Sequence, residues 1–137
     1  MVYVLDSNVM IHYLQKNASV KKNFFQAVAD GNRLLIPRAA DYEICRGLEL
    51  LSATAKAKIY KEITGSTGQC EIVDMGECVW EIAKQIYADL HRKDFTVGEI
   101  DILLGAFCLH HDYTLVTSNT KHFIHMNGLR LENWWAE

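Results

Sequence analysis

The stretch that decides the fold reads VYVLDSN, residues 2–8. Four apolar or aromatic residues run directly into a carboxylate, and two small polar residues follow it. A short, bounded apolar run of this kind indicates a buried strand of a parallel sheet. Because the ligands of open α/β sheets bind just beyond the carboxyl ends of the strands, Asp6 is predicted to stand at the mouth of a ligand crevice.

The rest of the chain alternates between strand-like and helix-like patterns. Asn8 is expected to cap a first helix, and Ser19 a second one that stops at Gly31. Further strands are predicted at residues 33–36, 70–74, 113–117 and 128–131, and further helices at residues 38–64, 77–93 and 99–111. The pattern over residues 38–64 indicates two helices with a break near Gly47 or Ser52. This alternation predicts an α/β fold with a mainly parallel sheet of four to five strands.

Size and composition are those expected of one globular domain over residues 1–137. Half of the residues are hydrophobic and 23% are charged, and no apolar run reaches membrane-spanning length. The amino terminus lacks the basic and small-residue features of a signal peptide, so a cytoplasmic location is expected. The net charge of −3 argues against non-specific nucleic-acid binding but leaves a local basic lining open. The four cysteines lack C-x-x-C spacing and are interpreted as reduced thiols, most of them in the core.

Polar residues follow two of the predicted strands, at 6–8 (DSN) and at 117–119 (TSN). If these strands are neighbours in the sheet, both polar sets converge on one crevice. Two further acids stand near the starts of predicted helices, where they can point into that crevice: Glu43 and Asp101. Each acid also has a simpler interpretation. Asp6 can cap the first helix, Glu43 can be solvated, and Asp101 can favour the helix macrodipole.

A cluster of these acids predicts a metal-dependent reaction. Two carboxylates about 5 Å apart repel by roughly 3 kcal/mol at an effective dielectric constant of about 20. Such a pair must raise a pKa or bind a cation. Oxygen ligands suit Mg²⁺ or Mn²⁺, which can polarise a phosphoryl oxygen and activate a water. Phosphodiester hydrolysis is the predicted chemistry.

Four motifs, in order, resemble those of the PIN-domain nucleases, and especially the toxins of the VapC type. They are LDSNV (5–9), YEICRG (42–47), VGEIDILLGA (97–106) and TSNTKHF (117–123), the last followed by GLRLENW (128–134). The resemblance spans essentially the whole chain. It implies a PIN-like α/β/α sandwich and a Mg²⁺-dependent endoribonuclease of a toxin–antitoxin system. It also implies an RNA substrate, inhibition by a cognate antitoxin protein, and a homodimer.

The resemblance also implies roles for single residues. Asp6 and Asp101 would bind the metal, and Glu43 would complete the acidic cluster through the metal or its water. The supporting hydrogen bonds would come from Ser7, Asn8, Thr117 and Asn119. Arg46, one turn along the helix from Glu43, is a candidate phosphate contact.

One position departs from the family pattern. The motif after the fourth strand usually carries another acid, and here His122 takes that place. A neutral imidazole removes one charge and one oxygen ligand, which argues against a second Mg²⁺ and suits Mn²⁺ better. His122 can equally be a spectator, or a cation near the scissile phosphate when it is protonated.

Two other functions compete with the nuclease. A phosphatase of the haloacid-dehalogenase kind also places an Asp after its first strand, but it needs a second Asp two residues later, where this chain has Asn8. A catalytically silent PIN-like module that binds protein or RNA is the other alternative. His122 favours this module, whereas the retention of Asp6, Glu43 and Asp101 favours the enzyme.

Overall fold

The computed structural model describes residues 1–135 and contains one five-stranded sheet in which every pair of strands is parallel. The strands are β1 (Val2–Leu5), β2 (Arg33–Pro37), β3 (Cys70–Val73), β4 (Thr114–Val116) and β5 (Arg130–Glu132). Their order across the sheet is β3-β2-β1-β4-β5. The predicted parallel α/β sheet is therefore confirmed, with β1 at its centre.

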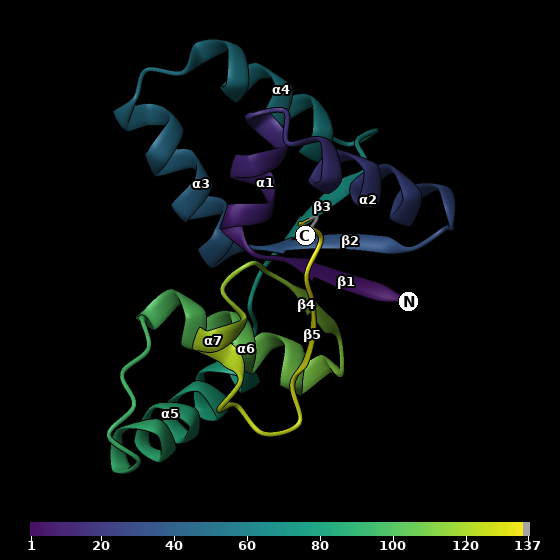
Figure 1. The fold of residues 1–137 in the computed structure, drawn as a ribbon. Coiled ribbons are helices and arrows are strands. Elements are labelled where there is room, and N and C mark those ends of the chain that lie inside the picture. Colours follow the sequence, from purple (N-terminus) through teal and green to yellow (C-terminus); the bar gives the residue numbers. More distant parts are fainter. Residues whose placement is uncertain (136–137) are drawn as a thin grey trace.

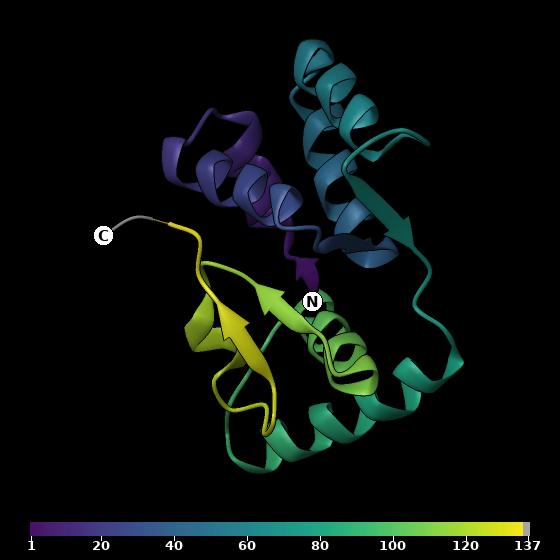
Figure 2. The same ribbon diagram turned by 90° about the vertical axis from the view of Figure 1, so that its right-hand side faces the viewer.

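Seven helices surround the sheet within residues 1–135. They are α1 (Ser7–Leu14), α2 (Ala18–Ala29), α3 (Arg38–Leu50), α4 (Thr54–Thr64), α5 (Glu77–Arg92), α6 (Glu99–His111) and α7 (Thr120–Phe123). Helices α1 to α4 lie on one side of the sheet and α5 to α7 on the other, as Figures 1 and 2 both show. These three layers form the expected α/β/α sandwich. No helix in this part of the chain is long and apolar enough to cross a membrane.

The pairing of β1 with β4 is the contact that positions the predicted site. Leu5 lies opposite Val116 in the parallel register, and the backbone N–H of Asp6 donates to the Val116 carbonyl at 3.0 Å. Both strands are short; β4 is wholly buried, and β1 is fully buried at Val4 and Leu5, as their β-branched and leucine residues predict. The residues that follow β1 and β4 therefore meet at the same edge of the sheet, as the sequence suggested.

Helix α6 is buried on several faces because it lies between the sheet and α5. Its run from Ile102 to Cys108 contains six buried residues, and its contacts with α5 are the most extensive between any two helices of the described chain. A helix that is apolar on most of its surface is stable only when other elements pack against several of its faces. This packing holds Asp101, in the first turn of α6, at the carboxyl edge of the sheet.

Two predicted helix caps are wrong. Helix α1 begins at Ser7, and Asp6 is its cap, accepting a hydrogen bond from the Ser7 N–H; Asn8 lies inside the first turn. Helix α2 is capped by Asn17, whose side chain accepts from the Val20 N–H at 3.0 Å. All of these residue types are good caps, so strand register and loop length decide between them.

The break in the segment 38–64 lies at Ser52, not at Gly47. Ser52 adopts a left-handed backbone conformation, with φ of 50°, between α3 and α4. Gly47 continues the helix because nothing requires it to leave the right-handed region. The sequence did not predict α7, which is a single short helix. The cysteines are free thiols as expected, but only Cys70 and Cys108 lie in the core.

Candidate active site

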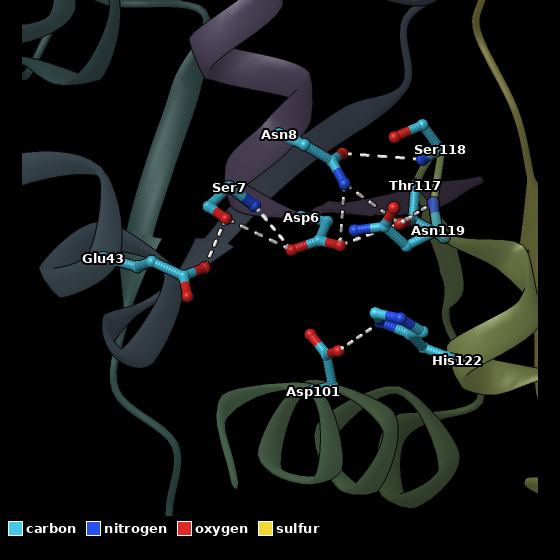
Figure 3. Close-up of polar contacts among 9 residues, drawn as sticks. All are labelled: Asp6, Ser7, Asn8, Glu43, Asp101, Thr117, Ser118, Asn119 and His122. Atoms are coloured by element: carbon cyan, nitrogen blue, oxygen red, sulfur yellow. Dashed lines mark hydrogen bonds and ion pairs between the residues drawn. The ribbon is translucent and has the colours of Figure 1, made fainter. Parts of the chain in front are cut away.

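Asp6 is the centre of a hydrogen-bonded cluster at the carboxyl edge of the sheet (Figure 3). Only 2% of its surface is exposed, and Thr117, which follows β4, is fully buried beside it. The Thr117 hydroxyl donates to Asp6 Oδ2 at 2.7 Å, and the Ser7 N–H donates to Asp6 Oδ1 at 2.7 Å. Donors on both carboxylate oxygens hold the Asp6 side chain in one orientation.

Ser7 connects Asp6 to Glu43, which comes from the second turn of α3. The Ser7 hydroxyl donates to Glu43 Oε1 in a short hydrogen bond, and it lies 3.5 Å from Asp6 Oδ1. Figure 3 shows the Glu43 carboxylate turned toward Ser7 and Asp6. Glu43 is therefore a member of the cluster and not a solvated helix residue, because a buried serine fixes its carboxylate.

The asparagines support the cluster at longer range. Asn8 Nδ2 lies 3.4 Å from Asp6 Oδ2 and 3.5 Å from the Thr117 hydroxyl, so these contacts are weak. Asn119 contributes through its backbone N–H, which donates to the Thr117 hydroxyl at 3.0 Å. That hydroxyl therefore both accepts and donates, and its proton is directed at Asp6.

Asp101 approaches the cluster from the other side of the sheet. Figure 3 shows its carboxylate rising from α6 toward Asp6, with His122 of α7 beside it. His122 Nδ1 lies 2.9 Å from Asp101 Oδ2. Since an ionised carboxylate only accepts hydrogen bonds, Nδ1 is the donor. His122 thus orients the Asp101 carboxylate.

The acids influence one another electrostatically. Burial raises the pKa of Asp6 to about 6, the Thr117 hydrogen bond opposes this rise, and the charges of Asp101 and Glu43 add to it. Burial also raises the pKa of Asp101, and the charge of Glu43 raises it further. The hydrogen bond to His122 and the charge of His122 lower the pKa of Asp101 and oppose both effects. Shifts of this kind in a crevice are typical of functional carboxylates.

The donor chemistry of the cluster fits a hydrated Mg²⁺ or Mn²⁺. No three Asp, Glu, His or Cys side chains within residues 1–135 stand close enough together to hold a metal ion by themselves. Mg²⁺, however, retains several waters and needs only one or two carboxylates from the protein. Asp6 and Asp101 can supply these, since each oxygen that accepts one hydrogen bond keeps a second lone pair.

Comparison with known proteins assigns the family. A model of the PIN domain matches residues 3–129. The chain belongs to the PIN-domain family. The matched range includes Asp6, Glu43, Asp101 and His122. The haloacid-dehalogenase alternative is thereby left without support.

This PIN domain is similar over nearly its whole length to two curated ribonucleases. It is 25% identical to "Ribonuclease VapC2" of Rickettsia felis, covering 98% of each chain. It is 26% identical to the "tRNA(fMet)-specific endonuclease VapC" of Shigella flexneri, covering 96% of this chain and 97% of that protein. It shares its fold with VapBC2 from R. felis bound to a promoter DNA fragment, with a TM-score of 0.84, 24% identity, and coverage of 98% and 99% of the two chains.

Sequence reasoning missed two links within the PIN-domain site. The Ser7 hydroxyl bridge to Glu43 joins residues 36 positions apart, and the contact between His122 and Asp101 joins residues 21 positions apart. Both are side-chain contacts between elements, and no local pattern encodes them. The motif order did place all of these residues at the same edge of the sheet.

Replacing Thr117 by valine is expected to destabilise the metal-free PIN domain by about 2 kcal/mol at neutral pH, because ionised Asp6 then loses a buried donor. The loss should be smaller near pH 5, where more of Asp6 is protonated. Urea unfolding at both pH values measures this difference, with Thr117→Ser as the control that keeps the hydroxyl. An equal loss of unfolding free energy at both pH values would show that Thr117→Val acts through packing alone and not through the charge of Asp6.

Proposed function

We propose that this PIN domain is the toxin of a toxin–antitoxin pair and acts as a divalent-metal-dependent endoribonuclease that hydrolyses RNA phosphodiester bonds. The observation that carries the proposal is the convergence of Asp6, Glu43 and Asp101, from three different elements, at one edge of the sheet. The similar proteins from R. felis and S. flexneri, a ribonuclease and a tRNA(fMet)-specific endonuclease, support the reaction class.

In this proposal Asp6 and Asp101 hold the metal ion, and Glu43 reaches it directly or through a bound water. The ion supplies Lewis acidity at a phosphoryl oxygen and lowers the pKa of a bound water. Ser7 keeps Glu43 turned into the site, and Thr117 favours the charged form of Asp6. The Asn119 backbone N–H and, more weakly, the Asn8 side-chain amide both donate to the Thr117 hydroxyl and so help to fix it.

His122 favours a single metal ion in the proposed site. Its imidazole stands where related motifs carry another carboxylate, and its Nδ1 is engaged by Asp101. The site therefore has one oxygen ligand fewer to share between two ions. We assign His122 as a positioning residue for Asp101, and Mn²⁺ is expected to support activity alongside Mg²⁺.

The proposed partners are a cognate antitoxin and an RNA substrate. The structural neighbours include VapBC2 from R. felis and a protein described as a toxin-antitoxin complex from Klebsiella pneumoniae. An apolar groove of about 110 Å³ lies between α1, α3 and the α3–α4 loop, lined in part by Ile11, Leu48 and the exposed Leu51. A groove of this size suits one apolar side chain projecting from an amphipathic antitoxin helix. The homodimer and the cytoplasmic location are further predictions.

The alternative of a silent PIN-like binding module rests on the lost fourth acid at His122. A cleavage assay separates it from the nuclease. Purified protein without antitoxin is incubated with total cellular RNA in Mg²⁺, in Mn²⁺ or in EDTA. Discrete fragments that form only with a metal ion are expected, and their ends identify the target. Intact RNA in both metals would overturn the nuclease and leave the binding module.

The toxin role has its own test. Expression of the PIN domain alone is expected to arrest growth, and co-expression of the antitoxin is expected to relieve the arrest. Asp6→Asn should abolish the arrest without lowering the amount of soluble protein. Full arrest by this variant would show that cleavage is not its cause.

A further inference from the structure

Arg46 occupies a defined position at the edge of the acid cluster, one turn along α3 from Glu43. Its Nη2 lies 3.6 Å from Glu43 Oε2, which is close enough for charge attraction but beyond hydrogen-bonding distance. On the other side its guanidinium carbon lies 5.1 Å from the centre of the Tyr42 ring, which is a cation–π distance. The guanidinium is thus held between an acid and an aromatic ring.

The hydrogen-bond donors of Arg46 are not consumed by these contacts. Arg33, Arg38 and Arg130 each donate hydrogen bonds to an acid or a carbonyl. Within residues 1–135, the side chain of Arg46 makes no hydrogen bond, and 53% of it is exposed. The planar guanidinium group of Arg46 is therefore free to donate two hydrogen bonds to one phosphate group.

Tyr42 supplies a flat apolar surface beside this cation. Its side chain is exposed, at 59%. Arg46 covers only one face of the ring. Unpaired bases stack on exposed aromatic rings in this way, with little dependence on base identity.

A nuclease with this site needs a local cation, because its acids repel the substrate. The chain carries a net charge of −3, and three carboxylates surround the proposed cleavage point. A phosphate that approaches them without a metal ion meets like charges. Arg46 is the cation attached to Glu43, and so it lies next to these acids.

We propose that Tyr42 and Arg46 together form a nucleotide-binding lip of the active site. Arg46 binds a phosphate next to the scissile one, and Tyr42 stacks on the base of an unpaired nucleotide. The inference rests on the proposed nuclease function for its substrate class. It adds the residues that hold the RNA strand, and it predicts that cleavage falls in single-stranded RNA.

The test is a binding assay in EDTA, where no cleavage can occur. A fluorescent, unstructured RNA of about 12 nucleotides, a length within the span that aromatic platforms bind, is titrated with the full chain and followed by anisotropy. Tyr42→Ala and Arg46→Ala are each expected to weaken binding about tenfold, since stacking on one base is worth about 1–3 kcal/mol. Arg46→Ala should also lower the salt-dependence slope by about 0.7, whereas Tyr42→Ala should leave it unchanged.

Matched controls come from outside the lip. Tyr87 is exposed to a similar degree on α5, and Arg33 is exposed at the amino end of β2. Tyr87→Ala and Arg33→Ala remove the same ring and the same charge, and both are expected to bind RNA like the unaltered protein. Tyr42→Phe should retain binding because it keeps the ring.

The outcomes separate this inference from the proposed function. If Tyr42→Ala and Arg46→Ala bind RNA as tightly as the unaltered protein, or if the unaltered protein binds no RNA, the lip is wrong, whatever the cleavage assay shows. If both variants weaken binding and no metal-dependent cleavage occurs, the lip stands and the nuclease is wrong. If they weaken only the complex with the antitoxin, the pair belongs to a protein interface, and the lip is again wrong.

Discussion

Asp101→Asn is expected to lower metal-dependent RNA cleavage by about a thousandfold, which corresponds to about 4 kcal/mol of transition-state stabilisation. The substitution keeps the shape of the side chain and removes its charge. Asp101 stands on the most thoroughly packed helix, α6, and His122 orients its carboxylate. An amide in this place can still contact His122, but it binds a divalent cation far more weakly.

The measurement is single-turnover cleavage of a mapped target RNA at saturating Mg²⁺, with circular dichroism to verify the fold. Glu99→Gln is the matched control, because it removes an exposed acid from the same first turn of α6. It should leave cleavage within a few-fold of the unaltered rate. If Asp101→Asn cleaves at the full rate, the carboxylate serves only the helix macrodipole.

The second large effect concerns stability in the absence of metal. Burial raises the pKa of Asp6 to about 6 from 3.8, so the folded state holds this proton more tightly than the unfolded state. The contribution of protonated Asp6 to the free energy of unfolding is complete below about pH 4 and is lost as pH rises through about 6. A shift of about two units corresponds to about 3 kcal/mol. Ionised Asp6 therefore weakens the metal-free fold at neutral pH.

Urea unfolding in EDTA, from about pH 4 to about pH 8, should reveal this loss in the unaltered protein. Other groups also titrate over this range, so Asp6→Asn is measured in parallel, and the difference between the two curves isolates Asp6. Mg²⁺ should restore stability at neutral pH and have little effect near pH 5, because metal binding requires the ionised carboxylate. Parallel curves for the two proteins would show that the pKa of Asp6 is the same in the folded and the unfolded state, and would contradict this prediction.

The sequence was sufficient for the elements whose pattern is local. The apolar run before Asp6 and the helix that begins at Glu99 could be placed to the residue, because burial dictates hydrophobic periodicity. The convergence of the acids also followed from sequence, since the carboxyl ends of neighbouring parallel strands share one edge. The order of the four motifs then carried the family resemblance, and that resemblance indicated which role each acid has.

The rest depended on contacts between distant elements. Asp6, Ser7 and Asn8 are all suitable caps, and the register of β1 against β4, which ends at Leu5 and Val116, leaves Asp6 as the residue that caps α1. The neighbours of Tyr42 could not be inferred either. Its ring and Arg46 are four positions apart on one helix, but their place at the edge of the cluster depends on the direction in which Glu43 points.

The wide separation of Asp6 and Thr117 in the sequence determines when the active site can first form during translation. The two residues are 111 positions apart, and β1 obtains one of its two neighbouring strands only from β4. At a synthesis rate of about 5–20 residues per second, the ribosome needs roughly 5–20 seconds to supply the second half of the site. A nascent chain lacks Asp101 and Thr117 for most of that interval. Each newly made molecule therefore lacks a complete active site until β4 and the residues that follow it have been synthesised.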